Sequence, residues 1–430
     1  MQFTTKQVAI MIGGVVAIGF FVFLIYSNIK PPSADLGGGK KQITLRVWGV
    51  DSSSAFSEIS ENFEKLKQTQ GVDVDYRQFR EETFEDELLS ALAANIGPDV
   101  IMVKNRSLVR LQNKLSPLGP AQLKLTEIRR LFPTVVEQDF VDSTNGLVYA
   151  LPLYLDTLAF LYDRDVFDKS QVLNFPETWE RLSQDVTKLR ELAPNGQLSR
   201  SAIALGGTNR TVINGADTIL LLMLQRGARF PEGTIQADAV SNSVLDFYLQ
   251  FSNPSSPFYS WNETFGSSFD AFVAHKTAII PIYYSQLVKL LQKDPFLRYQ
   301  VAPMAQLNPQ SPINYADYWG LAVVRQSSQV NLAWEYVRYA TMQPANASVY
   351  ATRTSRPPAL KSLLEADLAD PIKGIFARQA LTARSWPGPN DFYVRQIISN
   401  NIAAFLRGEL TQATALQAIE YQVRQVAQQR

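Results

Sequence analysis

The 430-residue sequence contains no cysteine and only one histidine, His275. Without cysteine the chain forms no disulfide, no zinc–thiolate centre and no thiol nucleophile, and it lacks the acylated N-terminal cysteine of a bacterial lipoprotein. One histidine cannot build a histidine-rich metal site, and any Ser-His-Asp triad would have to use His275. We therefore expect neither a metal ion nor a cofactor.

The sequence also lacks an excess of charge of either sign. Its 41 basic and 40 acidic side chains give a formal net charge of +1. Proteins that bind nucleic acid through its phosphates usually carry a basic excess or a basic stripe, and the sequence has neither. Hydrophobic residues make up 46% and charged residues 19%, a balance typical of a folded globular protein. We expect no nucleic-acid partner.

One long hydrophobic run stands at the N-terminus. The segment from Val8 to Tyr26 carries no charge, and as a helix it would measure roughly 28 Å, close to the hydrocarbon thickness of a bilayer. We predict a retained single-pass anchor that meets the membrane through residues 8–29. The alternative is a cleaved signal peptide, whose apolar region is usually shorter, about 7–15 residues, and ends at a small-x-small site.

Beyond a Pro- and Gly-rich linker at residues 31–41, predicted strands alternate with predicted helices. The run Ile43–Val50 alternates as a strand does, and apolar residues three and four apart then predict a helix. The wholly apolar DVIMV at residues 99–103 predicts a buried strand. This alternation is typical of βαβ units and of an α/β protein with a parallel sheet.

Several phrases of the sequence occur in the order typical of one protein family. They are ALAANIGPDVIM at residues 91–102, Tyr-Ala-Leu-Pro at 149–152, Pro-Glu-Thr-Trp at 176–179, FDAFVAHKTAIIPIYY at 269–284 and YWGLAVVRQSSQVNLAWEYVRYA at 318–340. Through them the chain resembles bacterial family 1 extracellular solute-binding proteins, the group that includes maltose-binding protein. The chain departs from the family at His275, where glycine is usual, and in lacking the lipoprotein cysteine.

The resemblance implies a two-lobed periplasmic-binding-protein-like α/β fold of type II, preceded by one transmembrane helix. Such proteins close on a ligand held between the lobes by hinge bending. We expect the chain to cross between lobes near Pro152–Tyr154, Pro303 and Tyr339–Gln343. The expected parts are an anchor with a short cytoplasmic N-terminus (1–30), a linker (31–41), an N-terminal lobe (42–153 and 304–342) and a C-terminal lobe (154–303 and 343–430).

Carbohydrate sites combine aromatic faces, which cover the apolar sides of sugar rings, with planar polar groups that meet the hydroxyls. Aromatic and polar residues of this kind follow predicted strands, where open α/β sheets bind ligands. Core positions, solvated loops and helix caps are the alternatives for individual residues. The candidate ligand-binding residues are Trp48, Lys104, Asn105, Asp156, Thr157, Asn209, Asp217, Trp261, Tyr283, Tyr284, Tyr318, Trp319 and Tyr393.

The function that the resemblance implies is that of an extracytoplasmic substrate-binding protein of an ABC importer. It would act as a monomer, capture a sugar or oligosaccharide, and deliver it to the transmembrane subunits of a permease. The alternatives are a membrane-anchored sensor of the same fold and a binder of another polar solute, such as a peptide or a polyamine. We expect no enzyme, because no pair of acidic residues stands in a motif typical of glycan hydrolysis.

Overall fold

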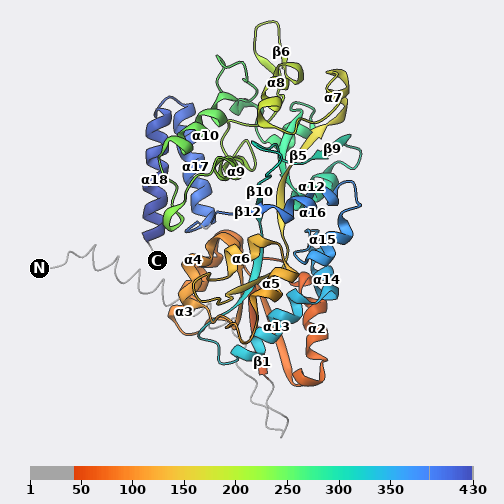
Figure 1. Ribbon diagram of the computed structural model, residues 1–430, viewed down its shortest axis with the longest axis vertical. Helices are drawn as coiled ribbons and strands as arrows, with labels where there is room; N and C mark the ends of the chain where they lie inside the picture. The colour runs from red at the N-terminus through yellow and green to blue at the C-terminus, as the bar shows by residue number, and fades with distance from the viewer. Residues whose placement is uncertain (1–42, 387, 429–430) are drawn as a thin grey trace, which may run out of the picture. The chain divides into compact units, whose positions relative to one another are not determined.

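The computed structural model describes residues 43–386 and 388–428 (Figure 1). The predicted anchor from Val8 to Tyr26 and the linker at residues 31–41 lie outside these residues. Among the helices that the structure does describe, none is both long enough and apolar enough to cross a membrane.

The N-terminal lobe is built on a five-stranded sheet in the order β2-β1-β3-β11-β4. Its strands are β1 (Ile43–Gly49), β2 (Val72–Gln78), β3 (Val100–Lys104), β4 (Ala150–Pro152) and β11 (Trp319–Val323). β1 and β3 run parallel, whereas β11 runs antiparallel to both β3 and β4. β3 is buried along its whole length because it lies inside the sheet with packing on both faces. The predicted strands at Ile43–Val50 and at residues 99–103 are thus confirmed.

Helices cover this sheet and bury one apolar side each. In the first of them, Ile59 and Phe63 lie four residues apart and are both buried. The helices of the N-terminal lobe are α2 (Ser57–Glu64), α3 (Glu81–Ala93), α4 (Leu108–Leu111), α5 (Leu125–Leu131), α6 (Thr134–Phe140), α13 (Val330–Met342), α14 (Pro344–Thr354) and α15 (Lys361–Asp367).

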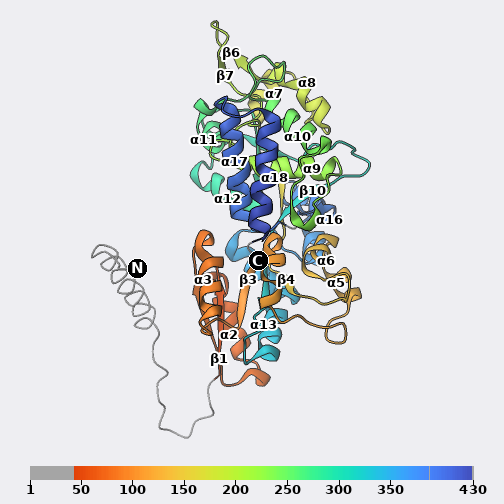
Figure 2. The same cartoon turned by 90° about the vertical axis from the view of Figure 1, so that its left-hand side faces the viewer.

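The C-terminal lobe has its own sheet in the order β12-β10-β5-β8, with β9 also paired to β5. Its strands are β5 (Asp156–Asp163), β8 (Ile279–Tyr283), β9 (Tyr299–Ala302), β10 (Asn314–Asp317) and β12 (Ala383–Arg384). A small hairpin joins β6 (Glu191–Leu192) to β7 (Leu198–Arg200). Two long helices at the end of the chain pack side by side against this lobe (Figure 2).

The helices of the C-terminal lobe pack around two further hydrophobic cores. They are α7 (Arg164–Lys169), α8 (Trp179–Leu189), α9 (Gly215–Gln225), α10 (Ala239–Gln250), α11 (Ser268–Val273), α12 (Tyr284–Lys293), α16 (Lys373–Leu381), α17 (Asp391–Leu406) and α18 (Gln412–Gln428).

The chain passes between the two sheets where adjacent strands belong to different lobes. The first passage lies at Leu153–Leu155, between β4 and β5. The second lies at Tyr318, between β10 and β11, rather than near Pro303, because β9 and β10 both pair with β5 in the C-terminal sheet. The expected boundary at residue 304 is corrected accordingly: β10 belongs to the C-terminal lobe.

The third passage also lies later than expected. α13 packs on β11 and α14 packs on α2, so both belong to the N-terminal lobe, whereas α16 packs on β5. The break at Tyr339–Gln343 only separates two helices of one lobe, with Pro344 opening the second of them. The chain leaves the N-terminal lobe after α15 instead, and the boundary expected at residue 343 moves with it.

His275, the one histidine, takes the place where the resemblance expects glycine. It has the left-handed backbone conformation (φ 55°) at the end of α11, which glycine adopts more readily. Its Nδ1 lies 2.6 Å from the Asp163 carboxylate, which also caps α7 by accepting from the backbone N–H groups of Asp165 and Val166. His275 therefore has a structural partner in the C-terminal lobe.

Gly320 should be intolerant of any side chain. It lies in β11, and a Cβ there would come within 2.6 Å of the Leu151 carbonyl oxygen and of the Phe140 ring. We expect Gly320→Ala to lower the free energy of unfolding by about 1–3 kcal/mol, measured by chemical denaturation of the full-length chain. The control is Gly119→Ala, whose Cβ would meet only the Gln122 side chain at 3.8 Å. Equal stability of the two variants would contradict this packing of β11.

Candidate ligand-binding site between the lobes

A completely buried arginine stands at the centre of the contact between the lobes. Strand β3 ends at Lys104, and the short 3-10 helix Asn105–Ser107 then turns Arg106 toward the C-terminal lobe. The Arg106 side chain has 0% of its surface exposed. A charge without access to water is stable in a protein only when other groups neutralise it and accept its hydrogen bonds.

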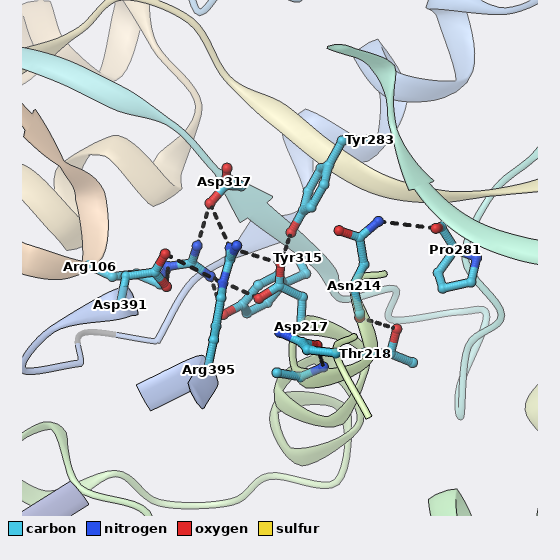
Figure 3. A network of polar contacts seen from close by, with 12 residues as sticks. Arg106, Asn214, Asp217, Thr218, Pro281, Tyr283, Tyr315, Asp317, Asp391 and Arg395 are labelled. Carbon is cyan, nitrogen blue, oxygen red and sulfur yellow. Dashed lines mark hydrogen bonds and ion pairs between the residues drawn. The ribbon is translucent and has the colours of Figure 1, made fainter. Parts of the chain in front are cut away.

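Elements of the C-terminal lobe supply these groups (Figure 3). Arg106 Nη1 lies 2.5 Å from the Tyr315 hydroxyl and 3.4 Å from Asp217 Oδ1. Nη2 contacts Asp317, and Nε lies 2.8 Å from Asp391 Oδ1. The guanidinium carbon lies 5.2 Å from the centre of the Tyr315 ring, which adds a cation–π contact.

Two further cations hold the same aspartates. Arg395 Nη2 lies 2.9 Å from Asp217 and 3.3 Å from Asp317, and Lys104 Nζ lies 2.8 Å from Asp317. Arg395 also pairs with Asp391, one helical turn earlier on α17. We call the six groups the interlobe charge network: Lys104, Arg106, Asp217, Asp317, Asp391 and Arg395.

The network shifts the pKa values of its aspartates in different directions. Burial alone would raise the pKa of Asp317, but attraction from Lys104, Arg106 and Arg395 outweighs burial and holds that pKa well below its ordinary value. Burial raises the pKa of Asp217, while Arg395 and Arg106 oppose the rise. Asp317 is therefore firmly ionised and anchors the cations around it.

A small cavity opens beside the network. Its volume is about 30 Å³, which admits a water molecule but no sugar ring. It is lined by Trp319, Tyr393, Lys104 and Asp391, together with acidic residues of α3. The lobes are thus in contact here, and the polar and aromatic groups of the site face one another across a space that is nearly filled.

Further contacts join the lobes at the edge of this cavity. The Asn390 side-chain amide, at the start of α17, lies 3.1 Å from Glu85 Oε2 on α3, and Arg110 lies 2.8 Å from the same oxygen. Ser385 donates to Asp139 on α6. Glu85 and Asp139 both belong to the N-terminal lobe, so the contact extends over two of its helices.

Five of the predicted site residues come together at this contact. Lys104 and Asp217 are members of the network, and the Tyr283 hydroxyl lies 2.8 Å from Asp217 Oδ2. Trp319 and Tyr393 line the cavity, and Lys104 Nζ lies 5.5 Å from the Trp319 ring centre. These residues come from both lobes and supply the aromatic faces and charged groups expected of a cleft.

Two predicted residues lie at the passage between β10 and β11. The Tyr318 hydroxyl and the Asn105 amide both donate to Asp139 Oδ2, at 2.7 and 3.0 Å. The Asn105 backbone N–H also donates to the Tyr318 carbonyl at 3.0 Å. Both side chains are buried, and their geometry braces the hinge rather than facing the cavity.

The structure places other predicted residues away from the network. Trp48 packs on Phe79, with ring centres 4.6 Å apart, in the N-terminal lobe. Thr157 and Trp261 are completely buried in the C-terminal lobe. Asn209 accepts from the backbone N–H of Ala216 at 2.8 Å in the first turn of α9, which is the role of a helix cap.

Tyr284 faces a different hollow. It lines a groove of about 460 Å³ together with Arg356 and Phe376, and its ring packs edge-on against Phe376. This groove is formed by α12 with α14, α15 and α16, and none of the network residues lines it.

Five residues of the network or in contact with it are not among the predicted ligand-binding residues: Arg106, Tyr315, Asp317, Asp391 and Arg395. Asp391 and Arg395 carried one available signal, an acid and a base four residues apart at the start of a helix, but such pairs are common on exposed helices. Asp317 ends a strand two residues before Trp319, and the end of a strand is where ligand residues are expected in an α/β sheet.

Asp156 caps α12 instead of facing the cavity. It is buried, and its oxygens accept from the backbone N–H groups of Thr157, Tyr284 and Ser285 at 2.9, 3.0 and 2.9 Å. Burial nevertheless raises the pKa of Asp156 to about 6.

This raised pKa makes Asp156 a source of pH-dependent stability. The Asp156 carboxyl binds its proton more tightly in the folded state than in the unfolded state. Protonation of Asp156 therefore raises the free energy of unfolding at low pH, and this contribution is lost as the pH rises through about 6. Between pH 5 and pH 8 the difference in the free energy of unfolding between the wild type and Asp156→Asn should move by about 1–1.5 kcal/mol in favour of the variant. Chemical denaturation across this pH range measures it.

The control for this titration is Asp246→Asn, at an exposed position on α10. The difference in the free energy of unfolding between this variant and the wild type should stay constant over the same pH range. A constant difference for Asp156→Asn as well would contradict the burial of the carboxylate charge.

Comparison with known proteins identifies the family. Residues 58–374 match the family described as bacterial extracellular solute-binding proteins, and the chain belongs to this family. The resemblance found in the sequence is thereby confirmed. Binding proteins of Brucella abortus and Brucella suis are 23% identical to the chain over 162 residues, which are 37% of this chain and 38% of theirs. The match therefore spans well under half the length of these relatives.

Solved structures share the fold over most of the chain. The sugar-binding protein MalE of Xanthomonas citri superposes with a TM-score of 0.74 at 21% identity, covering 90% of this chain and 98% of that one. A cyclic α-maltosyl-1,6-maltose binding protein of Arthrobacter globiformis gives a TM-score of 0.71 at 15% identity, covering 90% and 100%. The expected two-lobed α/β fold is confirmed.

Proposed function

We propose that this protein captures a sugar or oligosaccharide between its lobes and delivers it to the permease of an ABC importer. The observation that carries the proposal is the site at the lobe contact, where Trp319 and Tyr393 lie beside buried carboxylates and guanidinium groups. Two proteins of the same fold are named as a sugar-binding protein and as a cyclic α-maltosyl-1,6-maltose binding protein, which supports a carbohydrate as the solute.

The chemistry of these groups suits a polyhydroxylated solute. Carboxylates accept hydrogen bonds from hydroxyl groups, guanidinium groups donate to them, and aromatic faces cover the apolar side of a sugar ring. The Tyr393 side chain is 41% exposed, so its face can meet a solute that enters from outside. Asp217 and Asp391, on α9 and α17, place two acceptors on the C-terminal lobe.

The same arrangement favours binding without turnover. A general acid for glycan hydrolysis must hold a proton near neutral pH. The cations around Asp317 keep it ionised, and Asp391 contacts Arg106 and Arg395. Asp317 is therefore suited to orient hydroxyl groups rather than to protonate a leaving group.

A thermal-shift screen of the full-length chain tests this function. We expect sugars or oligosaccharides to raise the unfolding temperature, because a ligand that binds only the folded state stabilises it by mass action. Peptides and polyamines in the same panel should leave the temperature unchanged. Chromatography of a long incubation with the binding carbohydrate should recover it intact. A shift with peptides or polyamines alone, or a new product, would contradict the proposal.

Tyr393→Ala identifies the site within the molecule. Loss of the aromatic face should weaken binding of that carbohydrate by about 1–2 kcal/mol in calorimetric titration, without loss of folding. The matched control is Tyr421→Ala on α18, a tyrosine that is 65% exposed and does not line the cavity. Equal affinities of the two variants would remove Tyr393 from the site.

Members of this family work outside the cytoplasm, and we propose that the apolar segment from Val8 to Tyr26 is retained to hold the protein at the membrane. A tether keeps the lobes near the permease at a higher local concentration than free diffusion provides. N-terminal sequencing of the native protein extracted from membranes should find this segment still attached. A mature N-terminus between Ser27 and Lys41 would show that it is cleaved.

A further inference from the structure

The contacts of Arg106 connect one lobe to the other. Arg106 follows β3 of the N-terminal lobe, and the neighbouring Asn105 is fixed by its backbone hydrogen bond to Tyr318 at the hinge. The partners of its guanidinium lie on α9, β10 and α17 of the C-terminal lobe (Figure 3). The contacts of Arg106 with α9 and α17 therefore break when the lobes separate.

The charges of the two lobes are complementary at this contact. The N-terminal lobe brings Lys104 and Arg106, a formal charge of +2. The C-terminal lobe brings Arg395 and the three aspartates of the network, a formal charge of −2. The network is thus neutral as a whole, and the lobes attract each other at this point without any solute.

With the lobes in contact, the cavity beside the network is too small for a solute. Ligand cavities for small molecules usually measure about 300–1,000 Å³, whereas the cavity beside the network measures about 30 Å³. Arg106 donates to the carboxylates of Asp217 and Asp317 and packs over the Tyr315 ring. A carbohydrate makes the same two kinds of contact in a binding site, through its hydroxyl groups and its apolar face.

We propose that Arg106 is an intramolecular competitor of the solute: it closes the lobes in the absence of solute and must leave Asp217 and Asp391 before solute can enter. The inference that Arg106 closes the lobes rests on the interlobe charge network alone. The inference that Arg106 competes with solute rests on the proposed function. The apparent affinity for solute is then the intrinsic affinity reduced by the fraction of molecules that are open. Weakening the Arg106 contacts raises that fraction.

The absence of cysteine allows a direct test of the closure. Spin labels on Ser90→Cys of α3 and Gln396→Cys of α17, both exposed positions on opposite lobes, report the lobe separation by pulsed electron paramagnetic resonance. Without solute, the full-length chain should show one short distance. Arg106→Gln in the same labelled chain should add a longer and broader population.

Two variants make the result specific. Asp391→Asn removes a partner of Arg106 from the other lobe and should produce the same longer population, which guards against a folding defect of Arg106→Gln. Arg129→Gln removes an exposed ion pair with Glu137 within the N-terminal lobe and should leave the distance unchanged. A long distance already present in the unaltered chain, or an unchanged distance in both Arg106→Gln and Asp391→Asn, would overturn the proposal.

Titration with maltotetraose tests the competition separately. If the unaltered chain is open about one-tenth of the time, Arg106→Gln should bind this sugar about tenfold more tightly. Weaker binding by Arg106→Gln would overturn the competition and make Arg106 a direct contact of the solute. If neither chain binds any carbohydrate while the distances change as expected, the carbohydrate function fails and the closure stands.

Discussion

The arrangement of this molecule depends on a single constraint, which is that the charge of Arg106 has no access to water. A buried guanidinium needs several acceptors at fixed distances, and a missing partner costs more than an intact pair contributes. Here the acceptors come from α9 and β10, and α17 adds a further carboxylate as an ionic partner. These three elements are far apart in the sequence and meet only in the folded C-terminal lobe. Satisfying this one side chain therefore constrains the position of one lobe against the other.

The hinge is coupled to the same network through neighbouring residues. Asp317 ends β10 in one sheet, Trp319 begins β11 in the other, and Tyr318 lies at the passage between them. Asp317 holds Lys104 and Arg106, while Trp319 lines the cavity. A rotation at Tyr318 consequently moves a network carboxylate relative to an aromatic wall of the site, so opening of the lobes and disruption of the site are one motion.

Local sequence patterns predicted the elements of the fold well but not the partners across the lobes. The apolar run before Lys104 marked β3, and the placement of Lys104 and Trp319 at strand ends followed from it. The partners of Arg106 are 111 and 211 residues away in the sequence, and no local pattern relates residues at such separations. The aromatic residues show the same limit, because composition alone does not distinguish Trp261, completely buried in the core, from Trp319 beside the cavity.

The second passage between the lobes was misplaced for a similar reason. Pro303 looked like a break, yet the chain stays in the C-terminal sheet beyond it, and the true passage lies inside the continuous run from Asn314 to Val323. Which sheet each half of that run joins is decided by partners elsewhere in the chain, β5 for one half and β3 for the other. Strand pairing of this kind is a property of the whole fold.

The central claim is that solute and Arg106 share one place between the lobes, and a crystal structure of the protein with its bound carbohydrate tests it most directly. The account predicts hydroxyl groups of the sugar within hydrogen-bonding distance of Asp217 and Asp391, with the Arg106 guanidinium withdrawn from both. A sugar bound elsewhere while Arg106 keeps its contacts with Asp217 and Asp391 would contradict the account.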